Sequence, residues 1–259
     1  MKERGRFWFC ITFLIGSILA GFKVSGGIVM LAGLGAAALI DFIANKKFST
    51  FFLTGILSIS NYITIKSMTR GAEGFLLFVP WWFVRTMVVA GNRLDWIDLE
   101  HKRQFYLAQG GIRGFLRVMQ FEGIAFLIFL AGNMGFRVIG FVEIFRKYIY
   151  GFKKIYLNPF DVALLVTMIT GLIIPMLFVQ KGIIYNNIQF FQYFNLIFGF
   201  FSAITTYKIL TWIKNKTFKI LFIIFVFSFS LPTVLGNINE FYGQNSNPLA
   251  LVSNEELDA

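Results

Sequence analysis

A polar pair inside an otherwise apolar stretch is the first place in this sequence where side chains could do chemistry. Asn133 and Arg137 lie four residues apart within Val118–Ile144, so a continuous helix would place them on one face. An arginine in an apolar span indicates a function by default, because its charge is costly there. The alternatives are a packing pair that bonds carbonyl groups of a neighbouring helix, or an arginine that extends towards the membrane surface.

A second polar group begins a later apolar stretch. Gln189, Gln192 and Tyr193 follow a run of asparagines and are expected to share one face of a helix. Amide and phenol groups at the rim of a bundle suit ligands rich in hydroxyl groups, such as sugars. They suit hydrogen bonds between helices equally well, and both interpretations remain open.

Basic residues form a third group, in the long connection between residues 66 and 117. Arginine binds phosphate with two parallel hydrogen bonds, which favours a lipid phosphate or pyrophosphate as the partner. Lys23, in a tight turn, is a further phosphate candidate, and general head-group binding is the alternative for all of them. The acids nearby, Glu100 and Glu122 among them, are expected to form ion pairs with the arginines, and a role as a base is the alternative. The predicted lipid-phosphate or substrate contacts are Lys23, Arg85, Arg93, Arg103, Gln189, Gln192 and Tyr193.

Other kinds of site find little support. With one histidine, His101, and one cysteine, Cys10, the chain has no spacing typical of a metal site or a disulfide. No nucleotide-binding loop and no Ser–His–Asp arrangement is present, so no metal and no cofactor is evident. The net charge of +11 would favour nucleic acid in a soluble chain, but the basic residues cluster between apolar stretches. This pattern predicts contact with membrane lipid and no nucleic-acid partner.

The elements that must position these residues are apolar helices. The 259-residue chain is 57% hydrophobic and only 14% charged, and Val162–Val179 has no charged residue. Because lipid offers backbone groups no hydrogen bonds, such stretches must be helical. We therefore predict an all-α fold, a polytopic helical membrane bundle with about seven transmembrane helices plus an interfacial helical segment. The predicted spans are Phe7–Phe22, Gly26–Ile43, Ser49–Ile65, Val118–Ile144, Asp161–Gln180, Asn187–Tyr207 and Thr217–Leu235.

The chain divides accordingly into four parts. Residues 1–66 hold three spans, 67–117 form an extracytoplasmic interfacial segment, 118–235 hold four spans, and 236–259 form an extracytoplasmic tail. Within the interfacial segment, Trp81, Trp82 and Phe83 suit the head-group layer. The tail ends in a capping-box pattern, Ser253 with Glu256, which predicts the start of a truncated domain and a longer natural product.

Orientation follows from the loops. With the N-terminus inside, the Lys- and Arg-rich connections around Lys47, Lys153 and Lys214 lie on the cytoplasmic side. The sequence therefore predicts a multi-pass protein of a prokaryotic plasma membrane, with its C-terminus outside.

Several short motifs resemble one family of membrane enzymes. The turn Gly21-Phe22-Lys23, the stretch Val79–Phe83, the stretch Asn187–Tyr193, and Leu231–Thr233 leading to Val252–Leu257 are similar to motifs of GT-C-type glycosyltransferases. That group includes protein mannosyltransferase-like and YfhO-like proteins. The resemblance implies transfer of a sugar from a polyprenyl-phosphate donor on the outer face, with a divalent cation as a candidate cofactor.

The chain departs from this family at its catalytic residue. The resemblance implies an acid in the first external loop, yet Gly21–Ser25 contains none. No catalytic residue is therefore assigned, and the catalytic N-terminal part is expected to lie outside this chain. Two alternatives remain open. One is a transporter or flippase of a polar or lipid-linked solute, and the other is a non-enzymatic subunit in envelope assembly.

Overall fold

The fold is all-α, as predicted, with one short pair of strands. The computed structural model describes residues 2–68, 76–90, 94–150, 158–181 and 187–242. Its helices are α1 (Lys2–Phe22), α2 (Val24–Asn45), α3 (Ser49–Met68), α4 (Trp82–Val89), α5 (Ile97–Gln109), α6 (Gly111–Met134), α7 (Gly140–Ile144), α8 (Pro159–Leu177), α9 (Ile188–Trp212) and α10 (Lys216–Tyr242). A 3₁₀ segment η1 (Gly135–Ile139) and a π segment η2 (Phe145–Tyr150) flank α7, and the strands are β1 (Leu76–Phe78) and β2 (Phe178–Gln180).

Four helical stretches among the described residues are long and apolar enough to cross a membrane. They are Val24–Asn45, Gly111–Tyr148, Pro159–Leu177 and Ile188–Trp212. A shorter apolar helix covers Phe7–Phe22. The remaining predicted spans, Ser49–Ile65 and Thr217–Leu235, coincide with helices α3 and α10. The number of spans, about seven, stays a prediction.

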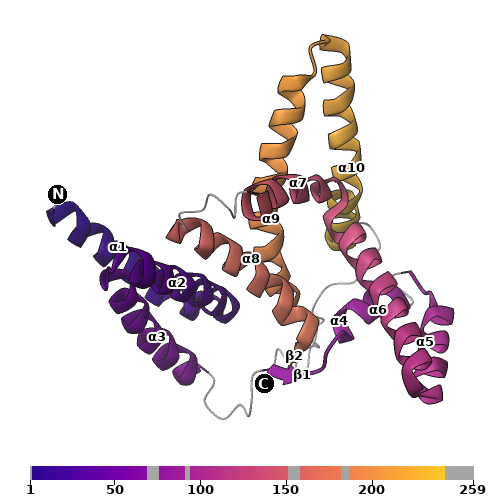
Figure 1. Cartoon of the computed structure of the whole chain (residues 1–259), viewed down its shortest axis with the longest axis horizontal. Helices are drawn as coiled ribbons and strands as arrows, with labels where there is room; N and C mark the ends of the chain where they lie inside the picture. The colour runs from indigo at the N-terminus through magenta and orange to yellow at the C-terminus, as the bar shows by residue number, and fades with distance from the viewer. Residues whose placement is uncertain (1, 69–75, 91–93, 151–157, 182–186, 243–259) are drawn as a thin grey trace, which may run out of the picture.

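Helix α8 joins the two sides of the molecule. Figure 1 shows α1, α2 and α3 gathered on one side and α5 and α6 on the other, with α8 packed against both α2 and α9. The strands add a second link, because β1 pairs antiparallel with β2, with Leu77 opposite Val179. This pairing brings the end of α8 beside the start of α4.

Glycine allows the helices around α8 to approach closely. A Cβ at Gly33 of α2 would lie 2.9 Å from the carbonyl oxygen of Ala163 on α8. A Cβ at Gly171 of α8 would lie 2.9 Å from the carbonyl oxygen of Phe190 on α9. Small residues at helix contacts are typical of packing inside membranes, where dispersion replaces the hydrophobic effect.

The core lies between α4, α6, α8 and α9. Phe129 of α6 contacts Phe83 of α4 and Phe191 of α9, with ring centroids 5.5 and 4.9 Å apart. Phe83, for which the sequence predicts a place in the head-group layer, has its side chain buried inside the protein with Val84 and Val88. The segment 67–117 therefore contributes a core helix as well as the amphipathic helix α5.

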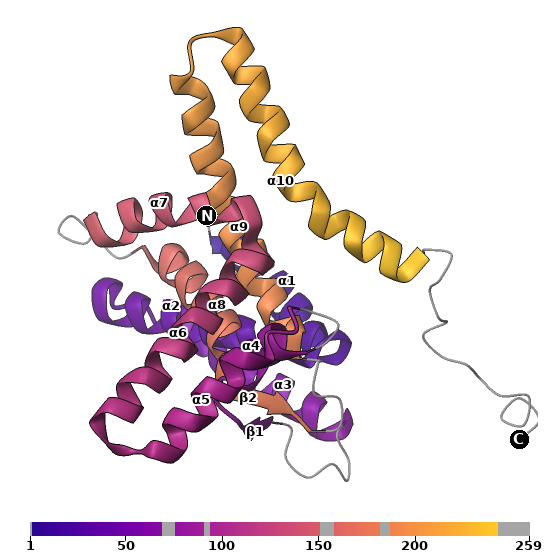
Figure 2. The same cartoon turned by 90° about the vertical axis from the view of Figure 1, so that its right-hand side faces the viewer.

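The predicted fourth span is not one continuous helix. It begins at Gly111, seven residues before Val118, and α6 ends at Met134. Gly135 has φ +48° and ψ −129°, a conformation that favours glycine, and η1 and α7 follow. Figure 2 shows α7 running across the end of α6 at a large angle. Asn133 and Arg137 are thus not on one face of a regular helix, which corrects that prediction.

The last described helix runs into the segment 236–259, which the sequence predicts to be an extracytoplasmic tail. Helix α10 continues to Tyr242, beyond the predicted end of its span at Leu235. The capping-box residues Ser253 and Glu256 lie outside the described residues.

The close contact at Gly33 yields a stability prediction. Gly33→Ala should lower the free energy of unfolding by about 1–3 kcal/mol, because the added methyl overlaps α8. Thermal unfolding of the detergent-solubilised protein measures the change. Gly35→Ala, on the same helix with nothing within 4 Å of the added Cβ, is the matched control. Equal unfolding temperatures for the two variants would contradict close packing at Gly33.

Candidate functional site

The break at Gly135 opens a polar cavity between η1, α9 and α10. Its volume is about 270 Å³, and we call it the Arg137 cavity. The residues that line it and matter here are Asn133, Arg137, Gln192, Asn195, Phe229 and Ser230. The sequence singled out Asn133, Arg137 and Gln192 in two separate groups, and the structure brings these three together.

Contacts of the neighbouring backbone hold the break in place. Ser202 of α9 donates a hydrogen bond of 2.5 Å from its hydroxyl to the carbonyl oxygen of Arg137. Gly140 lies against the same serine, which lets α7 approach α9 closely. Phe136 packs on Phe222 and Phe225 of α10, with both centroid distances at 5.9 Å. These contacts fix the backbone on both sides of Arg137, so its side chain is carried on an anchored turn.

The polar groups of the cavity are incompletely paired. Asn133 donates its amide to the carbonyl oxygen of Phe129, over 2.8 Å. The side-chain oxygen of Asn195 is buried and has no hydrogen-bond partner. Within the described ranges, the guanidinium of Arg137 makes no ion pair, and no carboxylate lines the cavity. A guanidinium beside amides can hold an anionic group and the hydroxyl groups attached to it.

The predicted group Gln189, Gln192 and Tyr193 divides between two places. Gln189 and Tyr193, one helical turn apart, face the start of α2. There the hydroxyl of Ser25 donates to Gln189 over 3.5 Å, and the Tyr193 hydroxyl lies against Gly26. Gln192 instead lines the Arg137 cavity, because it is rotated about 100° from Tyr193 around the helix. Only part of this group therefore belongs to the cavity.

Lys23 lies two residues before Ser25, the residue whose hydroxyl contacts Gln189. It is the residue before α2, with extended backbone, and its side chain is exposed. Its role as a phosphate contact stays a prediction.

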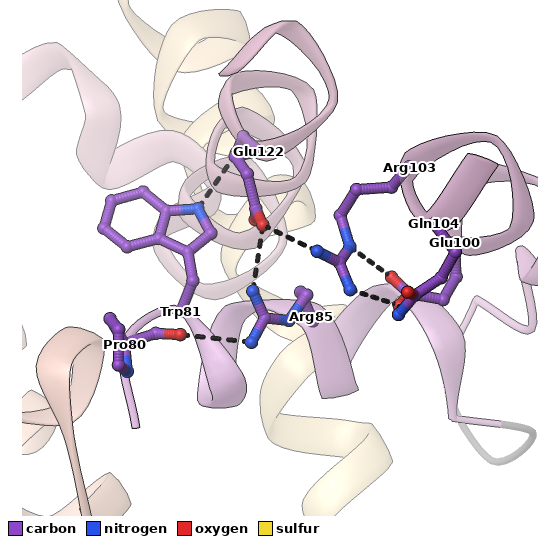
Figure 3. Close-up of polar contacts among 7 residues, drawn as sticks. All are labelled: Pro80, Trp81, Arg85, Glu100, Arg103, Gln104 and Glu122. Atoms are coloured by element: carbon purple, nitrogen blue, oxygen red, sulfur yellow. Dashed lines mark hydrogen bonds and ion pairs between the residues drawn. The ribbon is translucent and has the colours of Figure 1, made fainter. Parts of the chain in front are cut away.

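Two of the other predicted arginines, Arg85 and Arg103, join an ion-pair network. Glu122 of α6 accepts a hydrogen bond of 2.9 Å from Arg85 of α4, and Arg103 of α5 lies 3.6 Å from the same oxygen. Arg103 also bonds both oxygens of Glu100, at 2.5 and 2.8 Å (Figure 3). Trp81 donates its indole N–H to the carbonyl oxygen of Glu122. The network thus ties α4, α5 and α6 together.

Charges balance within this network, since two arginines face two carboxylates. The bonds from Arg103 hold the pKa of Glu100 below its usual 4.5, and the same bonds raise the pKa of Arg103. The observed ion pairs agree with the predicted pairing of Glu100 and Glu122. Because their charge is already balanced by these carboxylates, Arg85 and Arg103 would bind a phosphate less strongly. Arg93 lies outside the described residues.

One buried acid was not predicted. Glu143 of α7 is buried and accepts hydrogen bonds from Arg146, at 2.6 and 3.1 Å, and from Lys208 of α9, at 2.5 Å. The sequence contained an indication of this site, because Glu143 ends an apolar stretch and is followed within one helical turn by Arg146 and Lys147. Its ion pairs join α7 to α9, which is a structural role.

Neither a search for metal-binding groups nor a comparison with known proteins assigns a function to the chain. In the part of the chain that the structure describes, no group of three or more His, Cys, Asp or Glu side chains could hold a metal ion. Comparison of the chain with protein-family models, curated proteins and solved structures gives no match. The resemblance to GT-C-type enzymes therefore rests on the sequence motifs alone and stays a prediction.

The network predicts an effect of Glu122 on stability. Glu122→Gln should lower the free energy of unfolding by about 1–3 kcal/mol, because Arg85 and Arg103 lose the carboxylate that they share. Thermal unfolding in detergent measures it. Asp98→Asn removes one negative charge from an exposed acid of α5 and should have a smaller effect. A smaller loss for Glu122→Gln than for the control would refute the proposed bridging role.

The lowered pKa of Glu100 predicts that the stability of the protein depends on pH. Its folded pKa is lowered, so its stabilising contribution is complete above the unfolded value near 4.5 and disappears as the pH falls through the lower folded value. The unfolding temperature of the wild-type protein should therefore fall in that acidic range. The decrease should be shallower in Glu100→Gln, measured by the same thermal assay at a series of pH values. Parallel curves for the two proteins would show that this pair does not link protonation to folding.

Proposed function

We propose that this chain is the membrane part of a polyprenyl-phosphate-sugar-dependent glycosyltransferase. In this proposal it crosses a prokaryotic plasma membrane about seven times, with the N-terminus inside, and acts on the outer face. The Arg137 cavity binds the phosphate and the sugar of the lipid-linked donor.

The observation that carries the proposal is the unpaired cation of the Arg137 cavity. Arg137 has no carboxylate partner in the described structure, whereas Arg85 and Arg103 share two carboxylates. A phosphate would supply the missing negative charge through charge-assisted hydrogen bonds. Gln192 and Asn195 next to it offer donors and acceptors to sugar hydroxyl groups.

The cavity supports binding more directly than catalysis. Transfer of a sugar needs a base to activate the acceptor, and the described lining of the cavity has no carboxylate or histidine for that role. The proposal therefore assigns donor binding to this chain and the catalytic acid to a part outside it. Divalent cations prefer carboxylate oxygens, and the cavity offers only amides and a guanidinium. The cavity would therefore not hold a divalent cation by itself, and such a cation would arrive bound to the donor phosphate.

The broken helix favours a second candidate, a transporter or flippase. In many transporters the substrate lies where a membrane helix is interrupted, since the exposed backbone ends provide polar contacts. The interruption at Gly135 adjoins the Arg137 cavity in this way. Flux of a lipid-linked sugar across proteoliposomes containing the protein alone would favour this candidate over donor binding for transfer.

The binding role is tested at Arg137. Arg137→Gln in nanodiscs should bind tritiated undecaprenyl-phosphate-glucose about 10- to 100-fold more weakly than the wild type, because a hydrogen bond between charged groups is lost. Arg137→Lys should retain part of the affinity. Arg113→Gln removes an exposed arginine of α6 that makes no ion pair within the described residues, and should bind normally. Equal affinities for the Arg137→Gln and Arg113→Gln variants would overturn the proposal.

A further inference from the structure

The hairpin formed by the end of α9 and the start of α10 has an apolar groove at its tip. Figure 2 shows this hairpin standing clear of the other helices. The groove has a volume of about 650 Å³, and its lining is almost entirely apolar, with Ile213, Lys214, Phe218, Leu221, Phe222 and Phe225 on its walls. We call it the hairpin groove. Phe136 of η1 contacts Phe222 and Phe225 at one end of the groove, whereas Phe218, Leu221 and Phe225 are each about half exposed or more.

The turn of the hairpin is fixed by Asn215. Its side-chain oxygen accepts hydrogen bonds from the backbone N–H groups of Thr217, at 2.8 Å, and Phe218, at 3.4 Å. Bonds of this kind cap the N-terminus of a helix and satisfy donors that have no partner within it. The cap starts α10 directly beside the groove, so the residues around the tip have a defined arrangement.

Cations surround the groove without partners. Lys214, Lys216 and Lys219 lie at the tip, and none of them forms an ion pair in the described part of the chain. Lys208, lower on the same hairpin, is instead bound to Glu143. Residues 207–230 of the hairpin include no Asp or Glu, so no carboxylate of this stretch neutralises the positive charge at the tip.

Aromatic side chains set the level of the tip relative to a membrane. Trp212, the last residue of α9, is 77% exposed, and Tyr207, just over one turn earlier, is 69% exposed. Trp and Tyr gather at the interface between lipid chains and water. Because α9 is one of the helices that could cross a membrane, this places the groove among the upper acyl chains and the lysines among the head groups.

From this arrangement we infer that the hairpin groove retains one anionic phospholipid. An acyl chain packs against Phe218, Leu221 and Phe222, and the phosphate lies on Lys214 and Lys216. The choice of an anionic lipid rests on charge complementarity, since the ammonium group of a zwitterionic lipid offsets its phosphate and leaves no net negative charge for the lysines. The hairpin groove shares no lining residue with the Arg137 cavity, so its test does not depend on the donor binding proposed for that cavity.

The test is native mass spectrometry of the full chain released from detergent micelles. Phosphatidylglycerol and phosphatidylcholine with identical chains are titrated separately, and bound lipid is counted. The wild type is expected to retain one phosphatidylglycerol molecule well below the concentration at which phosphatidylcholine binds. Equal retention of the two lipids would overturn the inference, because it would indicate ordinary solvation by lipid.

Variants separate the two halves of the site. Replacing Lys214, Lys216 and Lys219 together by Gln should weaken retention of phosphatidylglycerol by on the order of a hundredfold. Lys46→Gln with Lys47→Gln removes two exposed charges at the α2–α3 turn and should leave it unchanged. Leu221→Trp fills the groove while keeping the lysines, and should also weaken retention.

The outcomes that contradict the site are distinct. An equal loss in the Lys46/Lys47 variant would show that overall charge attracts the lipid. Full retention by Leu221→Trp would show that the groove holds no chain. Circular dichroism and size-exclusion profiles matching those of the wild type establish that each variant is folded.

Discussion

The break in the helix at Gly135 is the constraint on which the rest of the site depends. A continuous helix would keep its own hydrogen bonds satisfied and would direct Phe136 and Arg137 to neighbouring positions around one axis. The left-handed conformation at Gly135 instead sends the chain across α9, where Ser202 holds the carbonyl group of Arg137. Phe136 can then contact α10 while Arg137 reaches the cavity. The backbone conformation of Gly135 therefore determines where Arg137 lies relative to the cavity.

Arginines in this chain are used in two different ways. Arg85 and Arg103 both lie beside Glu122 of α6, and Arg103 also pairs with Glu100 of its own helix α5, so their charge contributes to holding α4, α5 and α6 together. Arg137 has no such neighbour among the described residues. Arg137 lies in an apolar stretch of the sequence and beside amide groups, so its charge requires an explanation beyond ion pairing. The sequence could not place Glu122 beside Arg85 and Arg103, because Glu122 comes from another helix, α6.

The helices themselves could be predicted well from the sequence. Apolar runs located α1, α2, α3, α8, α9 and α10 to within a few residues at most ends, because spanning stretches carry few charges. The bend at Gly135 was not predicted, since a glycine within an apolar run is compatible with either a straight or a broken helix. The division of Gln192 from Gln189 and Tyr193 was also missed. Helix α2 packs against the side of α9 that carries Gln189 and Tyr193, and Gln192 on the adjacent side of α9 faces the cavity.

The pairing of β1 with β2 has a consequence for biogenesis. Leu76–Phe78 contacts Phe178–Gln180, a segment that leaves the ribosome only after α4, α5, α6 and α8 have been made. Long-range pairing of this kind must wait for its distant partner. During synthesis α4 therefore lacks the support of α8, and its apolar residues Phe83, Val84 and Val88 have no complete enclosure. The first half of the chain therefore gains its complete packing only after α8 and β2 have been made.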